Sequence, residues 1–184
     1  MRLLFRAFEF MTFVMSICMI SAGIMGLYVK GFNGSPPLPS LVVQFPIMLS
    51  MAIVLIVRLR ETTFGVLSAM PYVAIGLLAV ASFKWSVKPT FTLVEGITAL
   101  LFIVYLETMA WRYSWARLID GMWYAMFGMV ILSIILYFGV PSIGRMSETH
   151  VGTMSGLWVE KNAAGQIGVF GAGLALARLA ISPK

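Results

Sequence analysis

Long apolar runs with few charges alternate with short polar connectors along the whole chain. A helix needs roughly 20 apolar residues to cross a bilayer, and several of these runs come close to that length. They cover Phe8–Val29, Leu41–Val57, Thr63–Phe83, Phe91–Trp111, Ile119–Val140 and Asn162–Ile181. The pattern predicts an all-α, polytopic transmembrane helix bundle of about six spans.

Proline and glycine mark where the predicted helices end or bend. The connector GFNGSPPLPS cannot continue a helix, so the first span ends before it. Pro46 and Pro71 fall inside the second and third predicted spans, where membrane helices tolerate a kink. The first run follows Arg2 and Arg6 and exceeds the roughly 7–15 residues of a signal-peptide core. We therefore expect an uncleaved first span.

The composition excludes several classes of protein. Hydrophobic residues make up 60% of the chain and charged residues 11%, whereas soluble domains carry about 25% charged residues. Short loops leave no room for a separate soluble domain, so residues 1–184 are expected to form a single transmembrane unit. The net charge of +6 is not arranged as a basic stripe with aromatics, so no nucleic-acid partner is expected. Cys18 is the only cysteine, which excludes a disulfide framework and a cysteine metal cluster.

The distribution of basic residues predicts the orientation in the membrane. With both termini in the cytoplasm, seven of the eight arginines fall on the cytoplasmic side. The opposite side then holds Lys30, Lys84, Lys88, Arg145 and Lys161. The connectors 84–90 and 141–161 are therefore expected to face the periplasm or the cell exterior.

The connector after the fifth predicted span leads into a helix that begins Lys161-Asn162. A helix N-terminus favours an anion such as a phosphate, and Arg145, Lys161 and Asn162 add cationic or donor groups there. Gly165 would let a ligand or a neighbouring helix approach the backbone closely. The alternative is that Lys161 extends its ammonium group to the interface and that the glycines pack helices. The residues alone leave both interpretations open.

Two further places carry polar candidates. His150, the only histidine, is a weak candidate for a general base, because a lone loop histidine is usually inert. No set of metal ligands is apparent, so no metal is expected. Trp85 is typical of an interfacial anchor, and Lys84 and Lys88 could extend the cationic surface. Glu95 is either functional at membrane depth or paired with Lys88.

Two segments resemble motifs of a known family. Residues 156–165, GLWVEKNAAG, resemble the G-[LI]-[FW]-x-x-K-N-x-x-G signature of the O-antigen ligase/polymerase family, especially its exopolysaccharide-polymerase-like branch. An S-x-x-W-S-x-x-P-x-x-T pattern of that branch is matched earlier by Ser82, Trp85, Ser86, Pro89 and Thr92. The resemblance runs from about the third span to the end of the chain. Arginines that members often carry are replaced here by Thr153 and Ser155, and a usual basic pair by Val94 and Glu95.

The resemblance implies a fold and an activity. Members are inner-membrane glycosyltransferases of ten to twelve spans that move glycan from an undecaprenyl-diphosphate carrier to an acceptor sugar, or to lipid A–core, at the periplasmic face without a metal or other cofactor. Their catalytic periplasmic loop follows the K-N-x-x-G helix. This chain is therefore expected to be the N-terminal portion of such a protein in the bacterial inner membrane, and to be inactive by itself.

Two other functions remain as alternatives. A multi-span transporter or a membrane scaffold would also be rich in apolar helices, but transporters tend to show internal repeats or broken helices, which the sequence does not clearly display. An intramembrane protease would need a Ser/His or Asp/Asp pair inside the spans, and the sequence lacks one.

Overall fold

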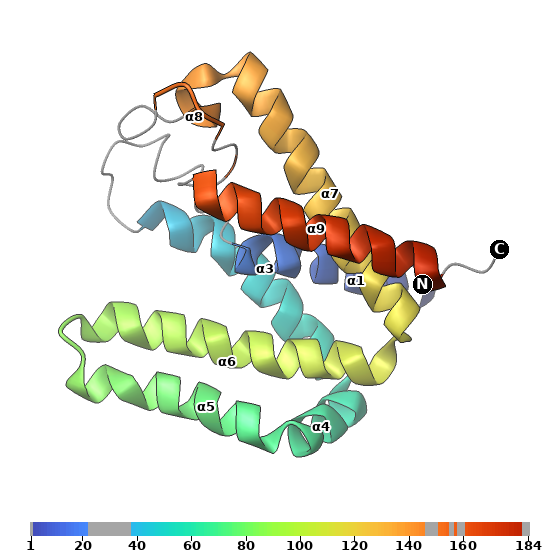
Figure 1. Ribbon diagram of the computed structural model, residues 1–184. Helices are drawn as coiled ribbons and strands as arrows, with labels where there is room; N and C mark the ends of the chain where they lie inside the picture. The colour runs from blue at the N-terminus through green and yellow to red at the C-terminus, as the bar shows by residue number, and fades with distance from the viewer. Residues whose placement is uncertain (1, 22–37, 146–150, 155–156, 158–160, 182–184) are drawn as a thin grey trace. The chain divides into compact units, whose positions relative to one another are not determined.

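The computed structural model describes residues 2–21, 38–145, 151–154, 157 and 161–181 (Figure 1). Every element in these residues is a helix, which confirms the all-α prediction. The chain divides into two compact units, one formed by 1–44 with 116–184 and the other by 45–115. The expectation of a single unit over 1–184 stays a prediction.

The second unit contains most of α3 (Leu38–Val57), followed by α4 (Leu59–Ser68), α5 (Met70–Ala81), the short 3₁₀ helix η1 (Ser82–Trp85) and α6 (Pro89–Arg112). Helices α5 and α6 form a hairpin whose turn includes η1 (Figure 1). Glycines bring the hairpin together: a Cβ at Gly96 would lie 2.8 Å from the carbonyl oxygen of Ala79. Because Gly96 has no Cβ, the two backbones can approach closely here, as backbones do at small residues between membrane helices.

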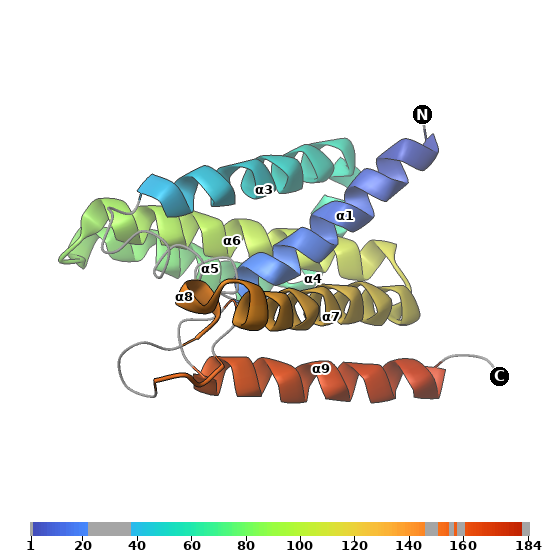
Figure 2. The ribbon, with the colours of Figure 1, turned by 90° about the horizontal axis from the view of Figure 1, so that it is seen from above.

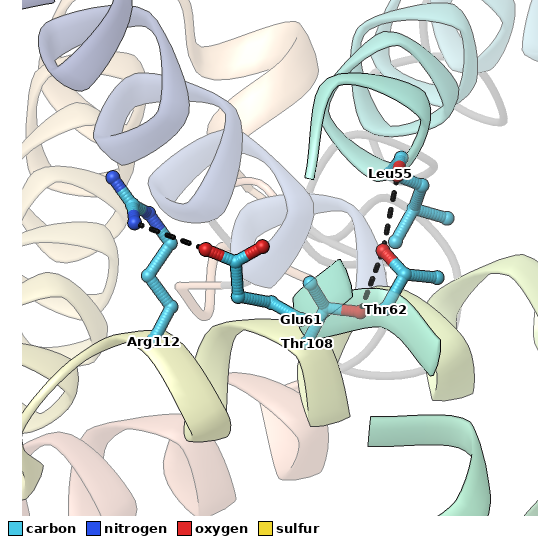
Figure 3. A network of polar contacts seen from close by, with 5 residues as sticks. All are labelled: Leu55, Glu61, Thr62, Thr108 and Arg112. Carbon is cyan, nitrogen blue, oxygen red and sulfur yellow. Dashed lines mark hydrogen bonds and ion pairs between the residues drawn. The ribbon is translucent and has the colours of Figure 1, made fainter. Parts of the chain in front are cut away.

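Helix α4 is attached to the end of this hairpin. A Cβ at Gly65 would lie 3.1 Å from the backbone nitrogen of Thr108, so α4 also packs closely on α6. Polar groups strengthen the junction, as Figure 3 shows: the Thr108 hydroxyl donates to Thr62 over 3.5 Å, and the Thr62 hydroxyl donates to the Leu55 carbonyl over 3.0 Å. Glu61 and Arg112 form an ion pair of 3.7 Å beside them.

The first unit contains α1 (Arg2–Ile20), α7 (Trp115–Gly139), the short α8 (Pro141–Gly144) and α9 (Lys161–Ile181). The Phe13 ring rests on Gly121, where a Cβ would come within 2.7 Å of it, so α1 packs on α7. Ser21 extends this contact by donating to the Met129 sulfur over 3.0 Å. Helix α9 packs on the same stretch of α7 as α1 does, with Gly171 against Met126 and Arg178 paired with Asp120 (Figure 2).

Three of the described helices are long and apolar enough to cross a membrane: α1 from Leu3 to Ile20, α6 and α7. The apolar stretches Gln44–Val57 and Gly165–Ile181 of α3 and α9 are shorter. The chain is thus a helical membrane protein with three candidate spans in the described residues, or four if a bent pair counts as one span. These are fewer than the six that the sequence predicts, and part of the first predicted span lies outside the described residues.

The third predicted span, Thr63–Phe83, is not one straight helix. Helix α4 and the α5–η1 segment meet at an angle of 92°, and the break falls at Ala69, whose backbone leaves the helical region. Pro71 explains the position of the break, because proline has no N–H to donate and its ring clashes with the carbonyl four residues earlier. Pro71 therefore lies in the first turn of α5 rather than kinking a continuous helix, whereas Pro46 does lie inside α3.

Candidate functional site

The segment that matches S-x-x-W-S-x-x-P-x-x-T forms the turn of the α5–α6 hairpin. The hydroxyls of Ser86 and Thr92 are hydrogen-bonded over 2.5 Å, and Ser86 also accepts the backbone N–H of Lys88 over 3.1 Å. Pro89 is the first residue of α6, a position where its missing N–H has no cost. The small polar residues of this motif therefore hold the turn in shape.

The two lysines of this turn lie at its surface. Lys84 in η1 and Lys88 just before α6 are both exposed, and Lys88 precedes a helix N-terminus, whose dipole favours anions. Trp85, 67% exposed, lies between them. The turn thus presents two cations and an aromatic ring from a rigid hairpin, and could contact an anionic group at a membrane surface.

Arg145 anchors the start of the connector between α7 and α9. Its Nε donates to the Tyr137 carbonyl over 3.2 Å, and its guanidinium lies 4.6 Å from the centre of the Tyr137 ring. Arg145 also pairs with Met154 in an isolated antiparallel bridge. These contacts hold the connector against α7 and use one of the N–H donors of Arg145. The residue therefore has a structural role besides any contact with an anion.

The connector returns to α7 a second time near Leu157. The Leu157 side chain, 3% exposed, packs with Met126 and Met129 of α7 and Leu174 of α9. Its backbone N–H donates to the Ser133 hydroxyl over 3.1 Å. Leu157 therefore belongs to an apolar cluster with residues of both α7 and α9. The only described residue of the GLWVE stretch is therefore a buried anchor placed four residues before α9.

Helix α9 begins at Lys161, as expected, with Asn162 in its first turn. The side chains of both residues lie outside the described part of the structure. Gly165 is exposed, and a Cβ there would meet nothing within 4 Å. The glycine leaves open space at this side of the helix rather than serving a close helix contact within the described residues. His150 lies outside the described residues, so its suggested role as a base stays a prediction.

The candidate residues belong to different units: Lys84 and Lys88 to the second, and Arg145, Lys161, Asn162 and Gly165 to the first. Within the first unit, Arg145 and Leu157 hold the connector that leads to Lys161. Glu95 is half-buried in α6 and makes no ion pair with Lys88 among the described side chains. No group of three metal-ligating side chains occurs in the described ranges.

The sequence interpretation overlooked Glu9. This carboxyl side chain has no exposed surface, and Thr12 and Ser16 on the same side of α1 are also buried. An ionisable group buried in a membrane helix is a functional candidate by default, since it is costly to retain there. The signal was present in the sequence as three polar residues at positions i, i+3 and i+7 of an otherwise apolar run.

A second overlooked cluster joins the far end of α9 to α7. The Arg178 guanidinium donates to Asp120 over 2.6 Å and to the Tyr124 hydroxyl over 3.2 Å, and lies 4.3 Å from the centre of the Trp123 ring. Arg178 and Asp120 are 58 positions apart in the chain, so only the folded packing reveals the pair. The cluster holds the last turns of α9 against the first half of α7.

Loss of this cluster is expected to loosen the last turns of α9. In Arg178→Gln, backbone amides of these turns should exchange hydrogen roughly two- to fivefold faster, the range of a partly exposed ion pair. Hydrogen exchange followed by mass spectrometry in detergent micelles would measure the change. Arg60→Gln, in the other unit, is the control and should leave α9 unchanged. Equal exchange in Arg178→Gln and the unaltered protein would contradict a clamping role.

Comparison of the chain with models of protein families, with curated proteins and with solved structures found no match.

Proposed function

We propose that the chain forms part of a membrane glycosyltransferase of the O-antigen ligase/polymerase type, which transfers glycan from undecaprenyl diphosphate to a sugar or lipid A–core acceptor. One observation carries the proposal: both segments that resemble the family motifs lead into the N-terminus of an apolar helix. Lys84 and Lys88 precede or flank the start of α6, and Lys161 starts α9. Each place combines lysine with the positive end of a helix dipole.

The order of the helices supports a common side for these two places. Helices α6 and α7 are both candidate spans and are joined by the two residues Tyr113 and Ser114. Two successive crossings return the chain to the side from which α6 starts, so the connector that leads to α9 begins on that side. In the proposed six-span topology with a cytoplasmic N-terminus, this is the periplasmic side of a bacterial inner membrane.

The chemistry of glycan transfer fits these groups. A diphosphate leaving group gains negative charge as the glycosidic bond breaks, and fixed cations and N–H donors aimed at it lower the barrier. In this proposal, Lys161 and Asn162 bind the diphosphate with the first N–H groups of α9, and Arg145 of the same unit adds positive charge. Lys84 and Lys88 at the start of α6 form a second cationic place for an anionic group. The acceptor hydroxyl needs a general base, for which His150 is the candidate. No metal or other cofactor enters the reaction.

The Lys161→Ala variant tests the proposal. With undecaprenyl-diphosphate-linked glycan as donor, the glycosyltransferase that contains this chain should transfer sugar, and Lys161→Ala should lower the rate by about tenfold or more because one cation facing the leaving group is lost. The measurement is the rate of product formation in membrane vesicles. Lys30→Ala removes a lysine outside both motifs and is the matched control. An unchanged rate in Lys161→Ala would remove Lys161 from the site, and absence of any transfer in the unaltered enzyme would refute the activity.

A transporter is the second candidate, because the break between α4 and α5 is of a kind that transporters use to bind ions. Two of the carbonyl groups near this break are hydrogen-bonded. Gly65 accepts the N–H of Ala69 and the hydroxyl of Ser68, and Ala69 accepts the N–H groups of Tyr72 and Val73. An ion site needs carbonyl groups turned toward the ion. These two carbonyl groups are therefore occupied within the protein.

A further inference from the structure

Helix α4 meets the α5–η1 segment at a right angle, and this geometry restricts how the second unit can lie in a membrane. Helix α6, with 24 residues, is about 36 Å long and is a candidate span. Its hairpin partner α5–η1 measures about 26 Å, close to the roughly 30 Å of hydrocarbon. The hairpin can thus cross without α4. If α5 follows the direction of α6 across the bilayer, α4 lies along the membrane plane (Figure 1).

Contacts with α6 show beside which part of α6 the helix α4 lies. The Trp111 ring donates its N–H to the Ser68 hydroxyl over 2.8 Å and lies 5.9 Å from the Phe64 ring, centre to centre. Glu61 pairs with Arg112, the last residue of α6. Helix α4 therefore lies beside the final turns of α6, where a tryptophan and an arginine mark a membrane–water interface. The opposite end of the hairpin carries another exposed tryptophan, Trp85.

The surface of α4 that faces away from α6 carries exposed leucines. Leu59 and Leu67 are exposed on it together with Thr63, and the exposed Phe64 lies at its edge beside Trp111. Glu61, Thr62 and Gly65 face the packed side. Arg60 is also exposed, with its guanidinium 6.0 Å from the centre of the Phe64 ring. An arginine among exposed apolar residues fits the boundary between acyl chains and headgroups, where the stem stays in hydrocarbon and the charge reaches a phosphate.

We propose that α4 is an interfacial helix that lies in the plane of the membrane surface, with Leu59, Phe64 and Leu67 inserted at the acyl boundary and Arg60 bound to anionic lipid headgroups. The partner of this surface is the lipid bilayer itself. The α4 segment then contributes nothing to the length of the third span, which is formed by α5–η1 alone. This inference depends on the membrane assignment of α6 and not on the proposed glycan transfer.

Spin labels at known positions test the orientation. In a Cys18→Ala background, a nitroxide is attached at Leu59→Cys, Thr63→Cys or Leu67→Cys, three exposed positions on one side of α4. The comparison series is Tyr72→Cys, Ile75→Cys and Leu78→Cys on α5, which are also exposed. Immersion depth is measured by power-saturation electron paramagnetic resonance in phosphatidylcholine vesicles that contain phosphatidylglycerol. All six side chains are at the surface, so the variants should fold, and circular dichroism checks this.

The expected depths differ between the two series. The α4 labels should lie at nearly the same depth, whereas the α5 labels should change depth by about 9 Å over six residues. If α4 continued the span, its labels would differ by about 12 Å over eight residues, and this result would overturn the proposal. Equal depths for all α4 labels in the aqueous phase, with no immersion, would overturn it as well.

A charge change tests the headgroup contact. With the label at Thr63→Cys, the variant Arg60→Glu should move the label toward water in vesicles with phosphatidylglycerol, because the carboxylate is repelled by lipid phosphate. Arg6→Glu, the same charge change on α1, is the control and should leave the label at its original depth. An unchanged depth in Arg60→Glu would overturn the assignment of Arg60 to the headgroups.

Discussion

Replacing Gly96 by alanine is expected to destabilise the α5–α6 hairpin. A Cβ at this position would lie 2.8 Å from both the carbonyl oxygen of Ala79 and the Cα of Val80. These are backbone atoms of the facing helix, so no flexible side chain can move away. Overpacking of this kind costs about 1–3 kcal/mol, and we expect it to outweigh the helical preference of alanine over glycine, about 1 kcal/mol at most.

The measurement is the free energy of unfolding of the detergent-solubilised protein, titrated with denaturant. Gly128→Ala on α7 is the matched control, because a Cβ there would meet nothing within 4 Å. This control should be neutral or slightly stabilising, since only the helical preference changes. If Gly96→Ala were as stable as Gly128→Ala, the close approach of α5 and α6 would be wrong.

Replacing Leu157 by alanine is expected to give the other large loss of stability. The side chain is almost completely buried among Met126, Met129 and Leu174, so its removal leaves a cavity between α7 and α9. Leucine-to-alanine substitutions at buried positions cost about 2–5 kcal/mol in soluble proteins, depending on how far the site collapses. The flexible methionines permit some collapse, which places the expected loss near 2 kcal/mol.

The same substitution on the exposed side of α9 gives the control. Leu179 lies at the surface, so Leu179→Ala should change the free energy of unfolding by no more than about 0.5 kcal/mol. Leu157→Ala should also disturb the start of α9, because the connector would lose its buried anchor. Faster hydrogen exchange in the first turns of α9 would show this. Equal stability of the two variants would contradict the placement of Leu157 between the helices.

The apolar pattern of the sequence predicted the helices well. Each predicted segment coincides at least in part with a described helix, from α1 to α9, because the need to satisfy backbone hydrogen bonds in lipid leaves helices as the simplest solution. Pattern alone misjudged the segment 63–83. The pattern predicted a kink at Pro71 but did not show how far the chain turns there, and α4 and the α5–η1 segment meet at an angle of 92°.

The candidate site was only partly predictable. Lysines near predicted helix starts pointed to Lys84, Lys88 and Lys161, and the structure does place them next to α6 and α9. The roles of Ser86 and Thr92 in closing the turn depend on two hydroxyls six residues apart coming together. The spacing of apolar residues along the sequence does not indicate such a contact.

The sequence by itself determined that this protein is helical, that its helices are apolar enough for a membrane, and that lysines stand at the starts of α6 and α9. These properties depend on local composition, because each segment is stable as a helix in the bilayer according to its own residues. The tertiary structure alone decided that Leu157 returns to the core, that Arg178 meets Asp120, and that α4 turns away from α5. The physical reason is that close packing and long-range ion pairs depend on which surfaces meet. The sequence does not show which residues far apart in the chain come into contact.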